Sequence, residues 1–149
     1  MSFSGIFTVK VAVTKAMYRF RKREMTNFDL VREFHEKFGH PVESSPQMPN
    51  EQLADLRIDL IDEEFHELKL AHANGDLTQW ADGLMDLLYV VYGACLVSGI
   101  DANAGLAEVH RSNMSKLGVD GKPLLRLDGK ILKGPNYSPP DLAKVLGIV

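Results

Sequence analysis

Apolar residues recur every three or four positions along most of the chain after Thr26, which is the spacing of one face of an α-helix. The stretches with this pattern begin at residues that cap helices well, such as Thr26, Asn50 and Asp101, and two of them end at Gly39 and Gly75. The pattern predicts four main helices, over residues 27–37, 51–74, 78–98 and 102–116.

The chain after Gly118 lacks this periodicity and is rich in Gly, Lys and Asp. Residues 119–137 are therefore expected to form turns, with a short hairpin at Asp128-Gly129. Ser138 and Pro139 suit the N-cap and the first position of a last short helix. The expected fold class is all-α: a four-helix-bundle core followed by a loop-rich basic C-terminal tail.

The N-terminal residues read differently from the rest. The run from Phe7 to Val13 alternates like a strand, whereas its basic, acid-free surroundings suit an amphipathic helix, and both interpretations stay open. We therefore divide the chain into an N-terminal extension of uncertain structure, residues 1–25, and one main domain, residues 26–149.

Charge and composition remove several classes of function. The formal net charge of −3 is too balanced to indicate nucleic-acid binding. Six of the 17 Lys and Arg residues lie within residues 1–23, so the main domain is acidic. The apolar stretch from Leu84 to Val97 is interrupted by Asp86, so no membrane segment is expected. The lone Cys95 excludes an internal disulfide and is expected in the core of a cytoplasmic protein.

Carboxylates stand where a bundle helix would normally carry leucines. The apolar seam expected on residues 51–74 turns acidic in its middle, and it consists of Leu53, Leu56, Leu60, Glu63, Glu67 and Leu70. At about 100° per residue, Glu63, Glu64 and Glu67 share one broad face of the helix. Asp82 and Asp86 lie four residues apart on the next helix.

Carboxylates gathered away from water either take up protons or bind a cation. Hard cations prefer carboxylate oxygens, so these five acids predict a site for Mg²⁺, with Mn²⁺ as a substitute. Glu63 and His66 also have the Glu-x-x-His spacing of di-iron bundles, but those sites need two such motifs. No other His has a Glu three residues before it.

The acidic pattern resembles that of a known superfamily. Residues 62–67, followed by Asp86-Leu-Leu-Tyr89, are similar to the Glu-Glu-x-x-Glu … Glu-x-x-Asp signature of the all-α nucleoside triphosphate pyrophosphohydrolases. This superfamily includes MazG-like enzymes, dimeric dUTPases and phosphoribosyl-ATP pyrophosphohydrolase. The resemblance extends to residues 27–35, 109–116, 128–133 and 139–142.

One position departs from that signature. The family motif has a Glu three residues before its Asp, where this chain has Gly83, and Asp82 stands one residue earlier. Positions three and four residues before Asp86 face nearly the same way on a helix, so Asp82 is expected to replace the missing ligand.

The resemblance implies Mg²⁺-dependent hydrolysis of a nucleoside triphosphate to the monophosphate and pyrophosphate, with dUTP or another deoxypyrimidine triphosphate favoured. It implies a metal site at Glu63, Glu64, Glu67 and Asp86, to which helix geometry adds Asp82. Glu63 is also the expected general base.

The resemblance further implies a substrate-binding set and a homo-oligomer, either a dimer or a tetramer. The residues expected to bind substrate are Tyr89, Asn113, Lys116, Lys130 and Lys133. The competing interpretation is a non-catalytic helical module, whose acids only solvate the helices while its apolar faces bind a protein partner.

Overall fold

The computed structural model describes residues 25–148, and every regular element in that range is a helix, as the sequence predicts. The interpretations of residues 1–24 lie outside the described part. The helices are α2 (Asn27–Phe38), α3 (Glu51–Asn74), α4 (Leu77–Val97), α5 (Ala102–Met114) and α6 (Leu142–Leu146).

The caps predicted for the first two helices are confirmed. Thr26 and Asp29 form a capping box: the Thr26 hydroxyl accepts a hydrogen bond from the Asp29 amide, and the Asp29 carboxylate accepts one from the Thr26 amide. The Asn50 side chain accepts from the amide of Leu53 at 2.9 Å. Local sequence therefore fixes where these helices begin.

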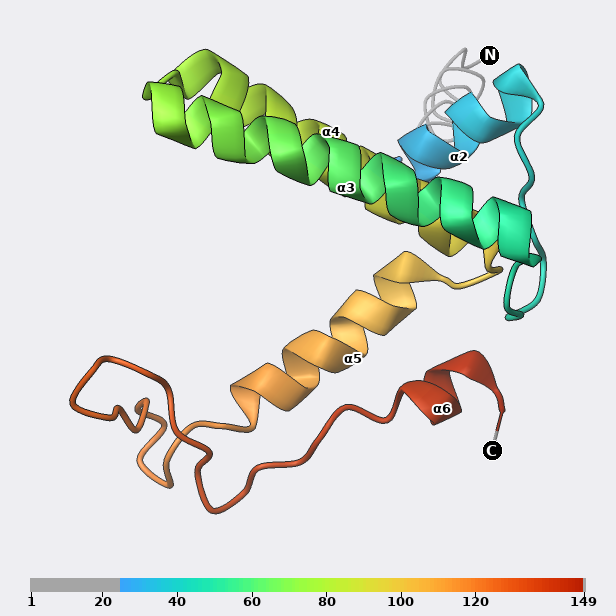
Figure 1. Cartoon of the computed structure of the whole chain (residues 1–149). Helices are drawn as coiled ribbons and strands as arrows, with labels where there is room; N and C mark the ends of the chain where they lie inside the picture. The colour runs from blue at the N-terminus through green and yellow to red at the C-terminus, as the bar shows by residue number, and fades with distance from the viewer. Residues whose placement is uncertain (1–24, 149) are drawn as a thin grey trace, which may run out of the picture.

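Helices α3 and α4 form a long antiparallel hairpin that is the largest packed unit of the described chain (Figure 1). Gly83 permits their close approach, since a Cβ there would lie 3.3 Å from the Cα of Leu68. Nearer the other end, a Cβ at Gly93 would meet the side chains of His35 and Arg57 at 3.0 and 3.2 Å. Gly83 thus lets the backbones of α3 and α4 approach closely, and Gly93 leaves room for these two side chains.

Helix α2 packs on α4 and encloses a small core of Phe28, Val31 and Leu96. Cys95 is partly buried against it, and its pKa is raised by that burial, as expected for a thiol in the core. Many other apolar side chains remain exposed. Those on α3, α4 and α5 include Leu56, Ile58, Phe65, Leu84, Met85, Leu88 and Leu106.

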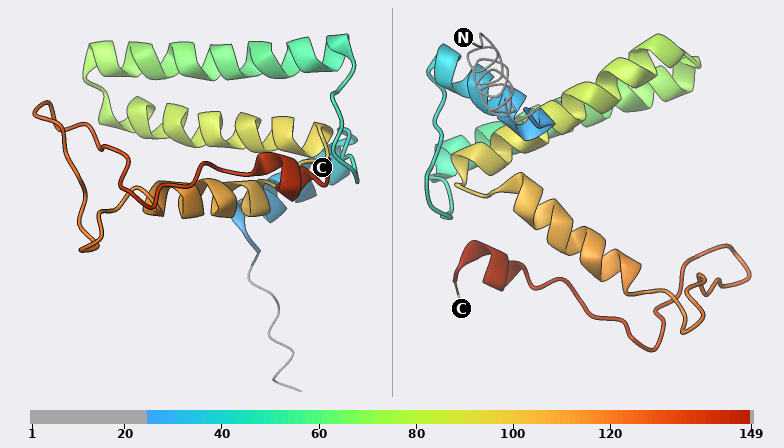
Figure 2. Two further views of the ribbon diagram at one scale, coloured as in Figure 1. Left: turned by 90° about the horizontal axis from the view of Figure 1, so that it is seen from below. Right: turned by 180° about the vertical axis from the view of Figure 1, so that it is seen from behind.

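Helix α5 diverges from the α3–α4 hairpin and packs mainly with α6 and the tail (Figures 1 and 2). Arg111 donates to the carbonyl of Pro139 at 3.0 Å, and Glu108 accepts from the amide of Asp141 at 2.8 Å. The Arg111 guanidinium and the Asp141 amide lower the pKa of Glu108 to about 2. These contacts hold the tail segment around Pro139 and Asp141 against α5.

Several helix boundaries differ from the prediction by a few residues. Helix α4 begins at Leu77, because Asp76 caps it by accepting from the amides of Thr78 and Gln79. Helix α5 ends at Met114 rather than near Lys116.

The last helix is not capped by Ser138. Asp141 caps it instead, while the backbone of Ser138 bonds the hydroxyl of Ser115. The hairpin predicted at Asp128-Gly129 is confirmed by a bridge between Leu125 and Ile131.

Among the described helices, α4 alone is long and apolar enough to cross a membrane by length and composition, with a mean hydropathy of 1.4 over its most apolar window. The sequence interpretation excluded such a segment because of Asp86. Helix α4 packs along α3 and against α2, but only 22% of that window is buried, and Leu84, Met85 and Leu88 are exposed.

Candidate functional site

The inward stripe of α3 differs by one position from the predicted seam. Arg57, Leu68 and Ala71 are buried, and Leu53, Leu60 and Glu64 are partly buried in line with them. Leu56 and Leu70 are exposed, as are Glu63 and Glu67. The predicted seam was therefore wrong in detail, because α4 packs on the stripe that contains Arg57 and Glu64.

Glu64 lies at the centre of the acidic cluster. Its pKa is raised above the ordinary value, first because burial penalises the charged form and then because of repulsion from Asp86, Glu67, Glu63 and Asp82, in that order. These four acids are the other members of the predicted metal site. The carboxylates of α3 and α4 therefore lie close enough together to act on the charge of Glu64.

Asp82 and Glu67 share a polar hollow between the two helices, which is also lined by Leu70, Gln79 and Gly83. A side chain at position 83 would begin 3.3 to 3.4 Å from the backbone and Cβ of Leu68, so helix packing favours glycine there. This explains in physical terms why position 83 carries no carboxylate. The nearest acid on this part of α4 is Asp82.

The donor set suits a hard divalent cation in its chemistry, since all five members supply carboxylate oxygens. Within residues 25–148, however, no three His, Cys, Asp or Glu side chains are arranged so that they could hold one metal ion together. Repulsion between like charges keeps carboxylates apart unless a cation offsets it. Ligation therefore requires the side chains to rotate toward a common point.

Three of the predicted substrate-binding residues lie together near the C-terminal end of α5. The Lys116 ammonium donates to the side chain of Asn113 at 2.7 Å, and the amide of Gly134 donates to the Lys116 carbonyl at 2.9 Å. Lys133 precedes that contact, and its ammonium lies 4.3 Å from the ring centre of Tyr137. Asn113, Lys116 and Lys133 thus form one basic group, which we call the tail cluster.

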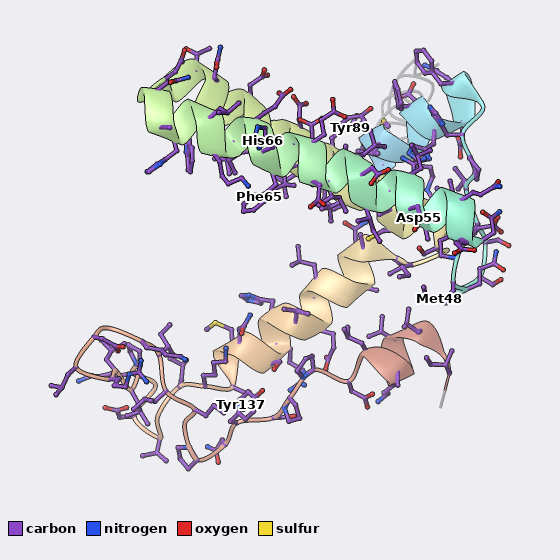
Figure 3. The ribbon with its side chains drawn as sticks, in the orientation of Figure 1. Met48, Asp55, Phe65, His66, Tyr89 and Tyr137 are labelled. Atoms are coloured by element: carbon purple, nitrogen blue, oxygen red, sulfur yellow. The ribbon has the colours of Figure 1, made fainter. Side chains whose placement is uncertain are left out.

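Lys130 lies outside the tail cluster, in the hairpin, where its amide donates to Asp128 and its carbonyl accepts from Arg126. The tail cluster and the acids are separated within one chain. Figure 3 shows Tyr137 beyond α5, away from His66 on α3 and Tyr89 on α4. His66 is exposed.

Tyr89 borders an apolar groove beside the acidic cluster. The Tyr89 ring packs edge-on against Phe34 at 5.6 Å, and burial raises its pKa. The groove follows α4 from the position next to Asp86, and its other lining residues are Asn27, Leu30, Val31, Met85, Leu88 and Tyr92.

Sequence reasoning missed Arg57 altogether. An Arg at position 57 falls in line with Leu53, Leu60 and Glu64, and this spacing was the available signal. The residue was overlooked because a charged side chain is normally assigned to the solvated face of a helix.

Comparison with known proteins identifies the family of the chain. The chain matches the family model for phosphoribosyl-ATP pyrophosphohydrolase over residues 31–113, which is more than half of its length. The chain therefore belongs to this family of all-α pyrophosphohydrolases, and the resemblance noted in the sequence is confirmed. The matched segment contains all five acids and ends at Asn113, so Lys116, Lys130 and Lys133 lie beyond it.

One relative is an uncharacterized protein of Acanthamoeba polyphaga mimivirus, 36% identical over 102 residues. The similarity covers 66% of this chain and 38% of the viral protein, so the chain spans well under half the length of that relative. A solved structure from Exiguobacterium sp. 255-15, proposed to be an NTP pyrophosphohydrolase, is 23% identical with a TM-score of 0.43. The match covers 82% of this chain and 93% of the bacterial one.

The raised pKa of Glu64 leads to a stability prediction. Because the folded state disfavours the charged form, Glu64→Gln should raise the melting temperature at neutral pH in EDTA. The gain should disappear below about pH 4.5, where the wild-type carboxyl is protonated in both the folded and unfolded states. Asp55→Asn, an exposed acid on the same helix (Figure 3), is the matched control and should change little. A Glu64→Gln melting temperature at or below wild type would contradict this account of the cluster.

Proposed function

We propose that this chain hydrolyses a nucleoside triphosphate between its α and β phosphates, in a Mg²⁺-dependent reaction that yields the monophosphate and pyrophosphate. The observation that carries the proposal is that the carboxylates of the four other predicted ligands all lie close enough to Glu64 to raise its pKa. Family membership supports the same reaction class. A deoxypyrimidine triphosphate such as dUTP is the first substrate to test.

In this proposal Glu64, Glu67 and Asp86 hold Mg²⁺, or Mn²⁺ in its place. Bound Mg²⁺ supplies charge neutralisation at the phosphates and lowers the pKa of bound water. Asp82 takes the part of the carboxylate absent at Gly83, and its shared hollow with Glu67 supports this assignment. The proposal thus gives the chain four metal-holding carboxylates on two helices, with Glu63 as a further candidate.

Glu63 serves as the general base that orients the attacking water and accepts its proton. Its exposed position next to Glu64, outside the stripe packed on α4, supports this role because the carboxylate is open to solvent. A carboxylate that binds several cations accepts a proton less readily. The position of Glu63 beside the proposed ligand Glu64 therefore suits a general base.

The substrate needs positive charge at its phosphates and an apolar surface for its base. Lys116, Lys133 and Lys130 provide the charge in this proposal, with Asn113 as a hydrogen-bond partner. The groove at Tyr89, which runs beside Asp86 and has a volume of about 190 Å³, is the proposed position of the base and sugar.

A homo-oligomer, either a dimer or a tetramer, is part of the proposal. The tail cluster and the acids lie on separate parts of one chain, so a second copy is required to bring Lys116 and Lys133 to the acids of the first. The exposed apolar side chains of α3, α4 and α5 supply the surface that such an assembly would bury.

The same apolar surface is the observation that favours a second candidate, a non-catalytic module that binds a protein partner through its helices. The two candidates differ in one property of the native protein. The enzyme binds divalent metal at the α3 and α4 acids, whereas the module has no need of it.

The first prediction for the enzyme concerns its product and its general base, Glu63. With Mg²⁺ and a panel of NTPs and dNTPs, the protein should release pyrophosphate and not orthophosphate. Glu63→Gln should lower kcat by roughly 10² to 10⁴, the usual contribution of a general base, while Mn²⁺ binding measured by calorimetry persists. Asp55→Asn is the control with unchanged turnover. Full activity of Glu63→Gln would remove Glu63 from the mechanism, and orthophosphate as the product would overturn the proposed reaction.

The second prediction tests whether two copies share one site. A variant with Glu64→Gln and Glu67→Gln and a variant with Lys116→Ala and Lys133→Ala should each be inactive alone. Mixing them after unfolding and refolding together should restore up to about a quarter of wild-type activity, because half of the dimers are mixed and each has one intact site. Mixtures that stay inactive while mixed dimers form would contradict a shared site.

A further inference from the structure

The apolar groove at Tyr89 lies beside the first turn of α2. One of its walls comes from α2 and the other from α4. Three of its apolar side chains are open to solvent, since Leu30, Met85 and Leu88 are 49%, 58% and 46% exposed. Exposed apolar side chains gathered in one hollow mark a surface that binds a ligand or another segment of protein.

The N-terminal segment, residues 1–24, joins the described chain next to this groove. Met25, where the described part begins, is two positions before Asn27 in the groove wall. Along α4 the groove extends from Tyr92 to Met85, which is about 10 Å. A chain of 24 residues spans about 36 Å as a helix and about 80 Å when extended. The segment is therefore long enough to fill the groove under both interpretations of its sequence.

The composition of the N-terminal segment matches the groove in apolar character. The segment has an apolar residue at every second position of one run, and these are Phe7, Val9, Val11 and Val13. Such side chains can cover Leu30, Met85 and Leu88 and so remove apolar surface from water on both sides of the contact.

The charges of the two partners are opposite as well. Residues 1–23 hold six Lys and Arg and no acid, which leaves 11 of the 17 basic residues against all 20 acidic ones in the rest of the chain. Asp86 follows Met85 at one end of the groove. At the other end, the hollow beside Met25 is lined by Asp29, Glu33 and Glu36, with Arg32 as its one basic residue. Basic side chains of the segment would therefore meet an acidic surface.

We propose that the N-terminal segment docks in this groove of its own chain, with its apolar side chains between α2 and α4. Attachment at Met25 favours this occupant over a second copy, because a short connection holds the segment beside the groove at an effective concentration on the order of millimolar. The groove is also the proposed position of the nucleotide base and sugar, so the docked segment competes with substrate. This competition rests on the proposed hydrolysis, whereas the docking does not.

The test of docking uses photo-cross-linking in the full chain, without metal or nucleotide. Met85 is replaced by the photo-reactive residue p-benzoylphenylalanine, and the cross-linked peptides are identified by mass spectrometry. Leu77, which is 78% exposed at the beginning of the same helix, is the matched control position. Refolding equal amounts of ordinary and ¹⁵N-labelled chains together distinguishes cross-links within one chain from those between two. Position 85 should cross-link to residues 1–24 of its own chain, and position 77 should not.

A second measurement changes the segment and leaves the groove intact. Val9→Asp with Val11→Asp places two charges at apolar positions and should abolish the cross-link from position 85. Thr8→Asp with Thr14→Asp adds the same charge at polar positions and should retain the cross-link. If the segment is docked nine-tenths of the time, the Val9 and Val11 variant should also lower the KM for nucleotide about tenfold at unchanged kcat.

Docking and hydrolysis can fail separately in this design. A cross-link from position 85 to residues 1–24 in a protein that releases no pyrophosphate would support docking and count only against the proposed reaction. The docking proposal is overturned if position 85 cross-links to a second copy of the chain, or to residues 1–24 no more than position 77 does. Cross-links that persist unchanged in the Val9 and Val11 variant would overturn it too.

Discussion

The close packing of α3 on α4 is the constraint on which the rest of the structure depends. Gly83 and Gly93 remove two side chains from α4, so that the backbone of Leu68 and the side chain of Arg57 can approach it. Between these two contacts, Glu64 of α3 comes under the influence of Asp86. The packing that stabilises the hairpin is therefore also what forces like charges together, and a bound cation would relieve that repulsion.

Much of this could be predicted from sequence because the relevant signals are local. The Thr26–Asp29 capping box, the Asn50 cap and the turn at Asp128-Gly129 act within a few residues, and the structure has all three. The common face of Glu63, Glu64 and Glu67 could be predicted for the same reason, since positions three or four apart on one helix lie close together.

What the sequence could not settle depends on contacts between distant segments. The helical period alone does not say which of two adjacent stripes on α3 faces α4, and the choice of the stripe with Arg57 displaced the predicted seam by one residue. Ser138 looked like a helix cap, but Ser115, 23 residues away, bonds its backbone, and Asp141 caps α6 instead. The separation of the tail cluster from the acids likewise follows from the course of α5, which no local pattern encodes.

The central claim is that the acids of α3 and α4 bind a divalent metal in the native protein, and the melting temperature with and without Mn²⁺ tests it most directly. A ligand that binds only the folded state raises the midpoint with its concentration. Millimolar Mn²⁺ should therefore raise the melting temperature of wild type, and a variant combining Glu64→Gln, Glu67→Gln and Asp86→Asn should lose that increase. The same melting temperature for wild type in Mn²⁺ and in EDTA would contradict the account.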